Sequence, residues 1–237
     1  MKTQRVRPVS RSCFRAFLLL LVALCFLRLS SADASENYIF AVYPVHDPNR
    51  MLTAFQPLAD FIAAETGVPV RLVVTGNYEE MTRRLADGSV HFAFFTSSGY
   101  VKHASSIPGL VYLATYAELD SKGGVTPYYH SMIISLEEGP VDALADLKGR
   151  NFGFTDKDST SGYKVPLTML RALGMEPASF FGKLFFLGRH DAVVEALRAG
   201  SIQGGAVSDG TLHNAVRQYG DLFRVLAVSE PIPLDAV

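Results

Sequence analysis

The strongest chemical signal in this sequence is a short run of hydroxyl residues that ends in glycine. It consists of Asp158, Ser159, Thr160, Ser161 and Gly162. The run stands between an expected strand over 151–155 and an expected helix that begins near Tyr163. Hydroxyls can replace the water around an oxyanion, and the first N–H groups of a helix have no partner within it. One of these hydroxyls could simply be an N-cap, but three in a row followed by glycine favour an oxyanion site.

A second turn of the same kind follows the expected strand over 90–95. Its residues are Thr96, Ser97, Ser98, Gly99 and Tyr100. Helix capping explains this turn as readily as ligand binding does. If both turns bind, they lie in different lobes and face each other across a cleft, with Ser98 and Tyr100 contributing from this side.

Three further side chains are candidates for the same pocket. His190 begins a helix after the strand over 184–187, where it either donates to an anion or is an ordinary capping residue. Asp209 opens another helix, as an N-cap or as the acceptor of a proton from the oxyanion or of an amine on the ligand. Tyr129 either lines a pocket or packs in the core. The residue types alone leave all three alternatives open.

Motifs for enzyme chemistry are absent from the sequence. It contains no G-x-S-x-G elbow, Walker loop, H-E-x-x-H pair or dinucleotide-binding glycine pattern. Both cysteines, Cys13 and Cys25, precede position 34, so the rest of the chain has no thiol for a disulfide, a nucleophile or a metal ligand. We therefore predict no catalytic residue, no metal and no cofactor.

The first 34 residues have the pattern of an export signal. Basic residues precede an apolar run over 14–27, and Ala32-Asp33-Ala34 forms a small-x-small cleavage site. The run is shorter than the roughly 20 residues that span a bilayer, so cleavage before Ser35 is favoured over a retained anchor. The prediction is a periplasmic protein whose mature chain begins at Ser35.

The charge of the remaining chain excludes several partners. Six of the 22 basic residues and one of the 23 acidic residues lie in the leader, which leaves a formal charge of −6 on residues 35–237. Such a surface repels nucleic acid and anionic membranes. An anion site must then be a local arrangement of hydroxyls and backbone dipoles.

Strands and helices alternate along the mature chain, with glycine or asparagine at most boundaries. The expected strands include 110–115 and 128–135. Asp47 and Pro48 open a helix that Gly67 ends, and Asn77 opens another. Strands separated by helices of this length predict an α/β fold with parallel sheets covered on both faces. We predict two lobes, 35–127 and 128–225, with 226–237 returning to the first lobe.

Several of these segments together resemble a known family, the phosphate, phosphite and phosphonate-binding proteins of ABC transporters. The most specific match is the run over 158–163, preceded by Asp146-Leu147-Lys148-Gly149 and followed by Pro166. Supporting matches are Phe55-x-Pro57-Leu58, Ser98-Gly99-Tyr100-Val101, Tyr129-x-Ser131, Gly188-x-His190-Asp191 and the segment 229–233. The resemblance implies a type II periplasmic binding fold, in which two lobes close on the ligand about a two-strand hinge.

The resemblance also implies a site and a role. Ser159, Thr160 and Ser161 would hold the oxyanion, and Tyr100, His190 and Asp209 would complete the pocket, with Ser98 and Tyr129 beside them. The expected function is capture of phosphate, phosphite or a phosphonate by a monomer that serves an ABC permease. The alternative is a sensing domain for a membrane histidine kinase or chemoreceptor. The sequence does not rank these oxyanions.

This chain departs from the family pattern in two places. The segment 90–95 is apolar where acidic and small residues are expected, which predicts a more apolar pocket wall. Relatives continue for several elements beyond the position of Pro233, so we expect the chain to be a C-terminally truncated member.

Overall fold

The first sheet is small and fully parallel. The computed structural model describes residues 37–119 and 124–237, and the predicted export signal lies outside them. The sheet has the order β2-β1-β3, with β1 at Tyr38–Val42, β2 at Val70–Val74 and β3 at Phe92–Phe94. Its strands carry a buried cluster that includes Phe40, Val42 and Phe94. Parallel strands need crossover connections, and helices supply them here.

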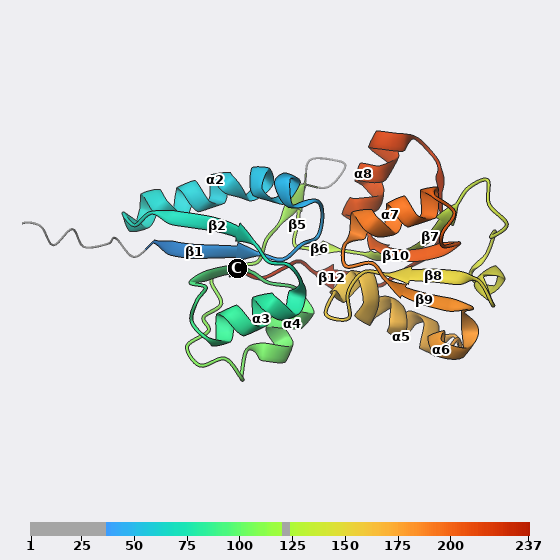
Figure 1. Cartoon of the computed structure of the whole chain (residues 1–237), viewed down its shortest axis with the longest axis horizontal. Helices are drawn as coiled ribbons and strands as arrows, with labels where there is room; N and C mark the ends of the chain where they lie inside the picture. The colour runs from blue at the N-terminus through green and yellow to red at the C-terminus, as the bar shows by residue number, and fades with distance from the viewer. Residues whose placement is uncertain (1–36, 120–123) are drawn as a thin grey trace, which may run out of the picture. The chain divides into compact units, whose positions relative to one another are not determined.

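Three helices cover this sheet, with α2 on one face and α3 and α4 on the other (Figure 1). Helix α2 spans Pro48–Thr66, α3 spans Tyr78–Ala86 and α4 spans Ser97–His103. The predicted ends of α2 are confirmed: the Asp47 carboxylate accepts from Asn49 N, and Gly67 adopts φ 69°. Asn77 caps α3 as predicted, because its side chain accepts from Glu80 N.

The second sheet has five strands in the order β11-β7-β10-β8-β9. They span Ser131–Leu136 (β7), Asn151–Phe154 (β8), Lys183–Phe186 (β9), Gly204–Ser208 (β10) and Phe223–Val228 (β11). Strands β8, β9 and β10 are parallel, whereas β7 pairs antiparallel with β10 and β11. Ile133 and Ile134 belong to different buried clusters, which follows from the alternation of side chains along a strand. Both faces of this sheet are therefore covered.

Helices on each face bury these two clusters. Figure 1 shows α7 and α8 on one face and α5 and α6 on the other. The helices span Val165–Ala172 (α5), Pro177–Phe180 (α6), His190–Arg198 (α7) and Asp209–Tyr219 (α8), and a 3-10 turn covers Leu144–Leu147. A five-residue π-helix, Thr160–Lys164, precedes α5. None of the helices within the two described ranges is long and apolar enough to cross a membrane.

The chain passes between the two sheets through short antiparallel pairs. Strand β6 (Tyr128–Tyr129) pairs with β12 (Ile232–Pro233), and β4 (Glu118–Leu119) pairs with β5 (Val125–Thr126). The sequence predicted one strand over 128–135, but it breaks at His130, because β6 pairs with β12 while β7 joins the larger sheet. Strand β11 lies wholly in the second sheet, so the chain returns toward the first sheet after residue 228.

The predicted strand over 110–115 is wrong, because these residues join neither sheet. Its partner is the end of the chain: Leu113 N donates to Val237 O at 2.8 Å, and Thr115 forms an isolated bridge with Ala236. The segment is extended, as its composition indicates, but pairing with only two or three residues does not make a continuous strand.

The turn after β8 depends on the absence of a side chain at Gly162. A Cβ atom built there would lie 1.8 Å from Thr155 Oγ1 and 2.6 Å from Thr155 Cγ2. Both residues are fully enclosed at the end of β8. A larger residue would push the hydroxyl turn away from the sheet.

We expect Gly162→Ala to lower the free energy of unfolding by about 1–3 kcal/mol, the usual penalty for overpacking. The better helix propensity of alanine, about 1 kcal/mol, offsets only part of this. Urea unfolding of both proteins measures the difference. Gly210→Ala is the control, because its Cβ would meet only Glu118 Oε2 at 3.9 Å. Equal losses in the two variants would contradict the steric explanation.

Candidate functional site

A cavity of about 260 Å³ lies at the ends of strands from both sheets. Tyr43 follows β1, Thr96 follows β3, and the hydroxyl turn 159–161 follows β8. Ser208 ends β10, and His190 begins α7 four residues after the end of β9. Ligands of open α/β sheets bind at the carboxyl ends of the strands, where helix N-termini point at them. This cavity lies at the carboxyl ends of strands of both sheets.

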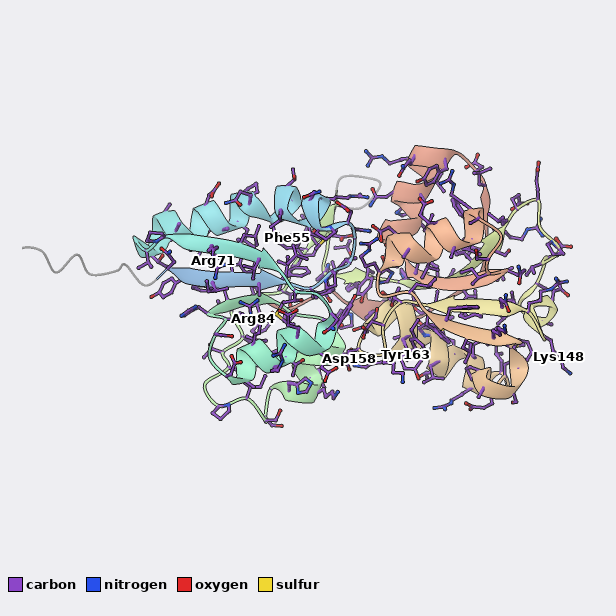
Figure 2. The ribbon with its side chains drawn as sticks, in the orientation of Figure 1. Phe55, Arg71, Arg84, Lys148, Asp158 and Tyr163 are labelled. Atoms are coloured by element: carbon purple, nitrogen blue, oxygen red, sulfur yellow. The ribbon has the colours of Figure 1, made fainter. Side chains whose placement is uncertain are left out.

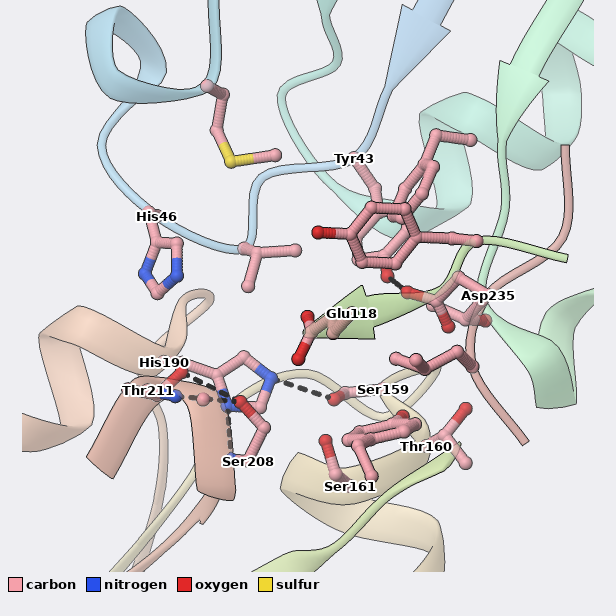
Figure 3. Close-up of a pocket in the computed structure, with 18 of the residues that line it drawn as sticks. Tyr43, His46, Glu118, Ser159, Thr160, Ser161, His190, Ser208, Thr211 and Asp235 are labelled. Carbon is pink, nitrogen blue, oxygen red and sulfur yellow. Dashed lines mark hydrogen bonds between the residues drawn. The ribbon is translucent and has the colours of Figure 1, made fainter. Parts of the chain in front are cut away.

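The hydroxyl turn forms one wall of this cavity (Figure 3). Ser159 is the N-cap of the π-helix, and its Oγ accepts from Gly162 N at 3.0 Å. Ser131 Oγ donates to the carbonyl oxygen of Ser161 at 2.7 Å and fixes the far side of the turn. Ser159, Thr160 and Ser161 are 2%, 6% and 3% exposed, so a ligand there would be bound almost without water. Buried hydroxyls and free N–H groups at a helix start can bind an anion.

His190 contributes a neutral hydrogen-bond donor. Its Nδ1 accepts from Ser208 N at 3.1 Å, which leaves the proton of the neutral ring on Nε2. Nε2 lies 3.4 Å from Ser159 Oγ. Burial lowers the pKa of His190 to about 3, and the nearby His46 acts in the same direction. The imidazole is therefore uncharged at neutral pH and points its N–H toward the hydroxyl turn.

Two buried tyrosines supply further neutral donors. Tyr78 Oη forms no hydrogen bond of normal geometry with any described residue, and burial raises its pKa well above 10 while the Ser159 hydroxyl lowers it less. Burial also raises the pKa of Tyr129, against smaller opposite effects of the Ser161 and Thr160 hydroxyls. Both phenols stay protonated. An unpartnered buried hydroxyl is costly, so a ligand that accepts from Tyr78 would gain that hydrogen bond.

Carboxylates complete the lining. Asp235 accepts from Tyr43 Oη and from Ser97 N (3.2 Å), and burial raises its pKa to about 6. Asp209 accepts from His130 N at 2.9 Å and from Gly210 N at 2.8 Å. Burial raises the pKa of Glu118, and Asp209 raises it further. These groups can accept an O–H or N–H from a ligand.

Six of the eight residues named from the sequence line the cavity. They are Tyr129, Ser159, Thr160, Ser161, His190 and Asp209. Ser98 lies behind the turn and hydrogen-bonds Thr160 Oγ1. Tyr100 does not line this cavity. It lines a second cavity and packs against Tyr112, with ring centroids 5.7 Å apart.

Several polar and charged lining residues were not named from the sequence, among them Arg50, Tyr78, Glu118 and Asp235. Tyr78 carried a weak signal, because it directly follows the helix cap at Asn77. Asp235 follows the segment 229–233 that contributed to the family resemblance, but nothing near it indicates burial. Phe94 also lines the cavity, in agreement with the apolar wall predicted from 90–95. Across the described residues, no cluster of three or more His, Cys, Asp or Glu side chains could hold a metal ion.

A family model described as "ABC transporter, phosphonate, periplasmic substrate-binding protein" matches residues 40–237. The chain belongs to this family. It is 24% identical over 193 residues to the phosphate-import protein PhnD of Mycolicibacterium smegmatis, a match that covers 79% of this chain. The chain spans about 60% of the length of that relative.

Solved structures of this family share the fold. A binding protein component of an ABC phosphonate transporter from Pseudomonas aeruginosa has a TM-score of 0.75 at 19% identity, covering 84% of this chain and 67% of that one. PhnD1 of Prochlorococcus marinus, solved with methylphosphonate, has a TM-score of 0.74 at 16% identity, covering 85% and 75%. The predicted type II periplasmic binding fold is confirmed. We call the part built on β2-β1-β3 the first lobe and the part built on the five-stranded sheet the second lobe.

The buried imidazole of this family member should make stability fall in acid. In the unfolded chain His190 takes up a proton near pH 6.5, whereas in the fold its pKa is about 3. The folded state therefore loses stability as pH falls below about 6.5. We expect the free energy of unfolding to drop less between pH 7 and 4.5 in His190→Gln than in wild type. Urea titrations at both pH values test this, with His213→Gln, an exposed position on α8, as the control; parallel losses in all three proteins would contradict it.

Asp235 should have the opposite effect: its ionisation should lower the stability of the fold as pH rises. Its pKa is raised from 3.8 to about 6 in the fold, so stability is lost as pH rises through that window. Relative to wild type, Asp235→Asn should gain stability between pH 4 and 7, on the order of 3 kcal/mol for a two-unit shift. The same urea titrations measure it, with Asp221→Asn on the exposed surface as the control. A difference between Asp235→Asn and wild type that does not change with pH would show that Asp235 ionises normally.

Proposed function

We propose that this chain captures a small phosphorus oxyanion, namely phosphate, phosphite or a phosphonate, in the cavity between its lobes. The observation that carries the proposal is the buried Ser159-Thr160-Ser161 turn at the start of a helix. The N–H of His190 and the phenols of Tyr78 and Tyr129 surround it. Neutral donors held in place can replace the hydration shell of an anion. The cationic side chain of Arg50 also lines the cavity.

The carboxylates favour an oxyanion that retains a proton. Asp209 and Asp235 would repel a fully ionised anion, but each can accept an O–H from a protonated one. A fraction of a phosphorus oxyanion population keeps such a proton at neutral pH, since the second pKa of a phosphate group lies near 6. This chemistry supports a phosphorus oxyanion over sulfate, which has no proton to donate.

What two relatives are named for also supports a phosphorus oxyanion as the ligand. The mycobacterial protein is named for phosphate import, and the structure from Prochlorococcus marinus contains methylphosphonate. Like the family, this chain would act in the periplasm and pass its ligand to an ABC permease without a covalent step. The leader over 1–34 supports that location, and recovery of exported protein beginning at Ser35 would test it.

Ser161→Asp should abolish oxyanion binding. A carboxylate in the turn would stand about 4 Å from the bound anion, and unit charges at that distance repel by about 4 kcal/mol at an effective dielectric of 20. Calorimetry with phosphate, phosphite and methylphosphonate should show affinity at least about a thousandfold weaker.

The control is Ser201→Asp, which adds the same charge at an exposed position beside the end of α7. It should bind as wild type does. A folded Ser161→Asp protein with wild-type affinity would remove the turn from the site. Wild-type protein that binds sulfate but none of the three phosphorus oxyanions would contradict the substrate class.

A further inference from the structure

The cavity is larger than a small phosphorus oxyanion requires. Its volume is about 260 Å³, whereas about 10–15 Å³ by the same measure holds one water molecule. An anion of a few heavy atoms at the hydroxyl turn would therefore fill only part of it. Near the start of α2 the cavity adjoins a smaller one of about 30 Å³, and four residues line both: His46, Arg50, Thr211 and Asn214. We call this shared wall the junction.

Arg50 is a cation without a counter-ion at the junction. Among the described residues, no side chain forms a hydrogen bond or an ion pair with its guanidinium group. Arginine stays charged at every physiological pH, and all of its side-chain N–H groups can only donate. The junction therefore offers a charged donor that no neighbouring group of the protein uses.

The carboxylates of the smaller cavity do not neutralise this cation. Asp191 pairs with Arg189 Nε at 3.1 Å and accepts from Asp47 N at 2.7 Å. Glu195 pairs with Arg198 Nη1 at 2.9 Å. Each of the two acidic side chains that line the smaller cavity thus has a partner of its own. The guanidinium on α2 remains available to a ligand.

Two further polar side chains at the junction also lack partners. The side-chain amide of Asn214 forms no hydrogen bond with any residue in the described part of the chain. His46 Nδ1 is buried, and no described residue lies within hydrogen-bond distance of it. Burial, more than the nearby Arg50, lowers the pKa of His46 to about 4, against a smaller opposite effect of Asp191. The ring is uncharged at neutral pH, so the junction carries the single charge of Arg50.

Both lobes contribute to the junction. His46 and Arg50 come from the loop after β1 and the first turn of α2, whereas Asn214 comes from α8 in the second lobe. The lobes touch here, because His190 N donates to the carbonyl oxygen of Val45 at 3.0 Å. Figure 3 shows His190 between His46 and the hydroxyl turn. A ligand bound at the turn by its phosphoryl group would extend its substituent past His190 to the junction.

We infer that Arg50, Asn214 and His46 form a second subsite, which takes a carboxylate on the substituent of an organophosphonate. The planar guanidinium donates through a rigid fork that matches a carboxylate, and the Asn214 amide can donate to the same group. The inference rests on the proposed function, since the phosphoryl group must bind at the turn. It narrows the ligand class from phosphorus oxyanions in general to phosphonocarboxylates.

A cationic substituent is the competing ligand chemistry. Glu118 and Asp209 line the same cavity, and burial raises the pKa of Glu118 while Asp209 raises it further. Asp209 already accepts from His130 N and Gly210 N. An amine would pair with these two carboxylates and would be repelled by Arg50. The relative affinities for an anionic and a cationic substituent therefore separate the two possibilities.

Calorimetry on wild-type protein with a series of phosphonates tests the subsite. Phosphonoacetate and 3-phosphonopropionate carry a carboxylate at different distances from phosphorus, propylphosphonate carries none, and 2-aminoethylphosphonate carries an amine. The better of the two phosphonocarboxylates should bind at least about tenfold more tightly than propylphosphonate, because a hydrogen bond to a charged group is worth that much. In Arg50→Met, which keeps an unbranched side chain but removes the charge, this ratio should fall to about one.

Arg71→Met is the matched control. Arg71 is an exposed residue of β2 that lines neither cavity, and Figure 2 shows it away from the place where the lobes meet. Its loss should leave the ratio of the two affinities as in wild type. Arg50→Lys should restore part of the ratio, since lysine keeps the charge without the fork. Asn214→Leu should also lower the ratio, which tests the subsite independently of position 50.

The outcomes separate this inference from the proposed function. Equal affinity of wild type for propylphosphonate and both phosphonocarboxylates, or binding of phosphate alone, would overturn the subsite and leave the proposed function intact. So would a preference for the carboxylate that persists in Arg50→Met, or tighter binding of 2-aminoethylphosphonate than of either phosphonocarboxylate. A wild-type protein that binds neither phosphate, phosphite nor any of these phosphonates would overturn both.

Discussion

The structure depends on keeping a hydrogen-bonding turn out of water at the end of β8. Ser159, Thr160 and Ser161 are almost fully buried, and a buried polar group without a partner is destabilising by roughly 1–3 kcal/mol. The fold supplies partners from both lobes: Ser131 from β7, His190 from α7 and Ser98 from α4. Gly162 lets the turn sit directly on Thr155. These contacts position the site.

The hydrogen-bond donors that line the cavity are mostly uncharged side chains. Burial keeps His190 uncharged and the tyrosines protonated, while the carboxylates of Asp209 and Asp235 accept hydrogen bonds from the backbone and from Tyr43. An acidic chain can in this way aim uncharged donors at an anion, in a cavity that Arg50 also lines. Protonation of His190 destabilises the fold, and ionisation of Asp235 does so as well. The dependence of the free energy of unfolding on pH therefore combines the effects of both residues.

The sequence predicted the parts of this fold that have local causes. Helix ends at Asp47, Gly67 and Asn77 follow from capping, and the hydroxyl turn stands where the pattern placed it. The break at His130 and the lone pairing of 110–115 with the chain end depend on partners distant in sequence. Burial of Tyr78 and Asp235 is equally non-local, which explains why they went unnoticed. The π-helix had no separate signal, because its residues suit an α-helix as well.

The aromatic lining has a practical consequence for spectroscopy. Tyr43, Tyr78 and Tyr129 border the cavity, and the rings of Tyr43 and Tyr78 lie 4.7 Å apart. The chain contains no tryptophan, so no indole absorbs or re-emits the light that these phenols give off. With Tyr116, which also lines the cavity, four of its ten tyrosines lie where a bound ligand would change their surroundings. The intrinsic ultraviolet fluorescence of the unlabelled protein is a built-in reporter of whether its cavity is filled.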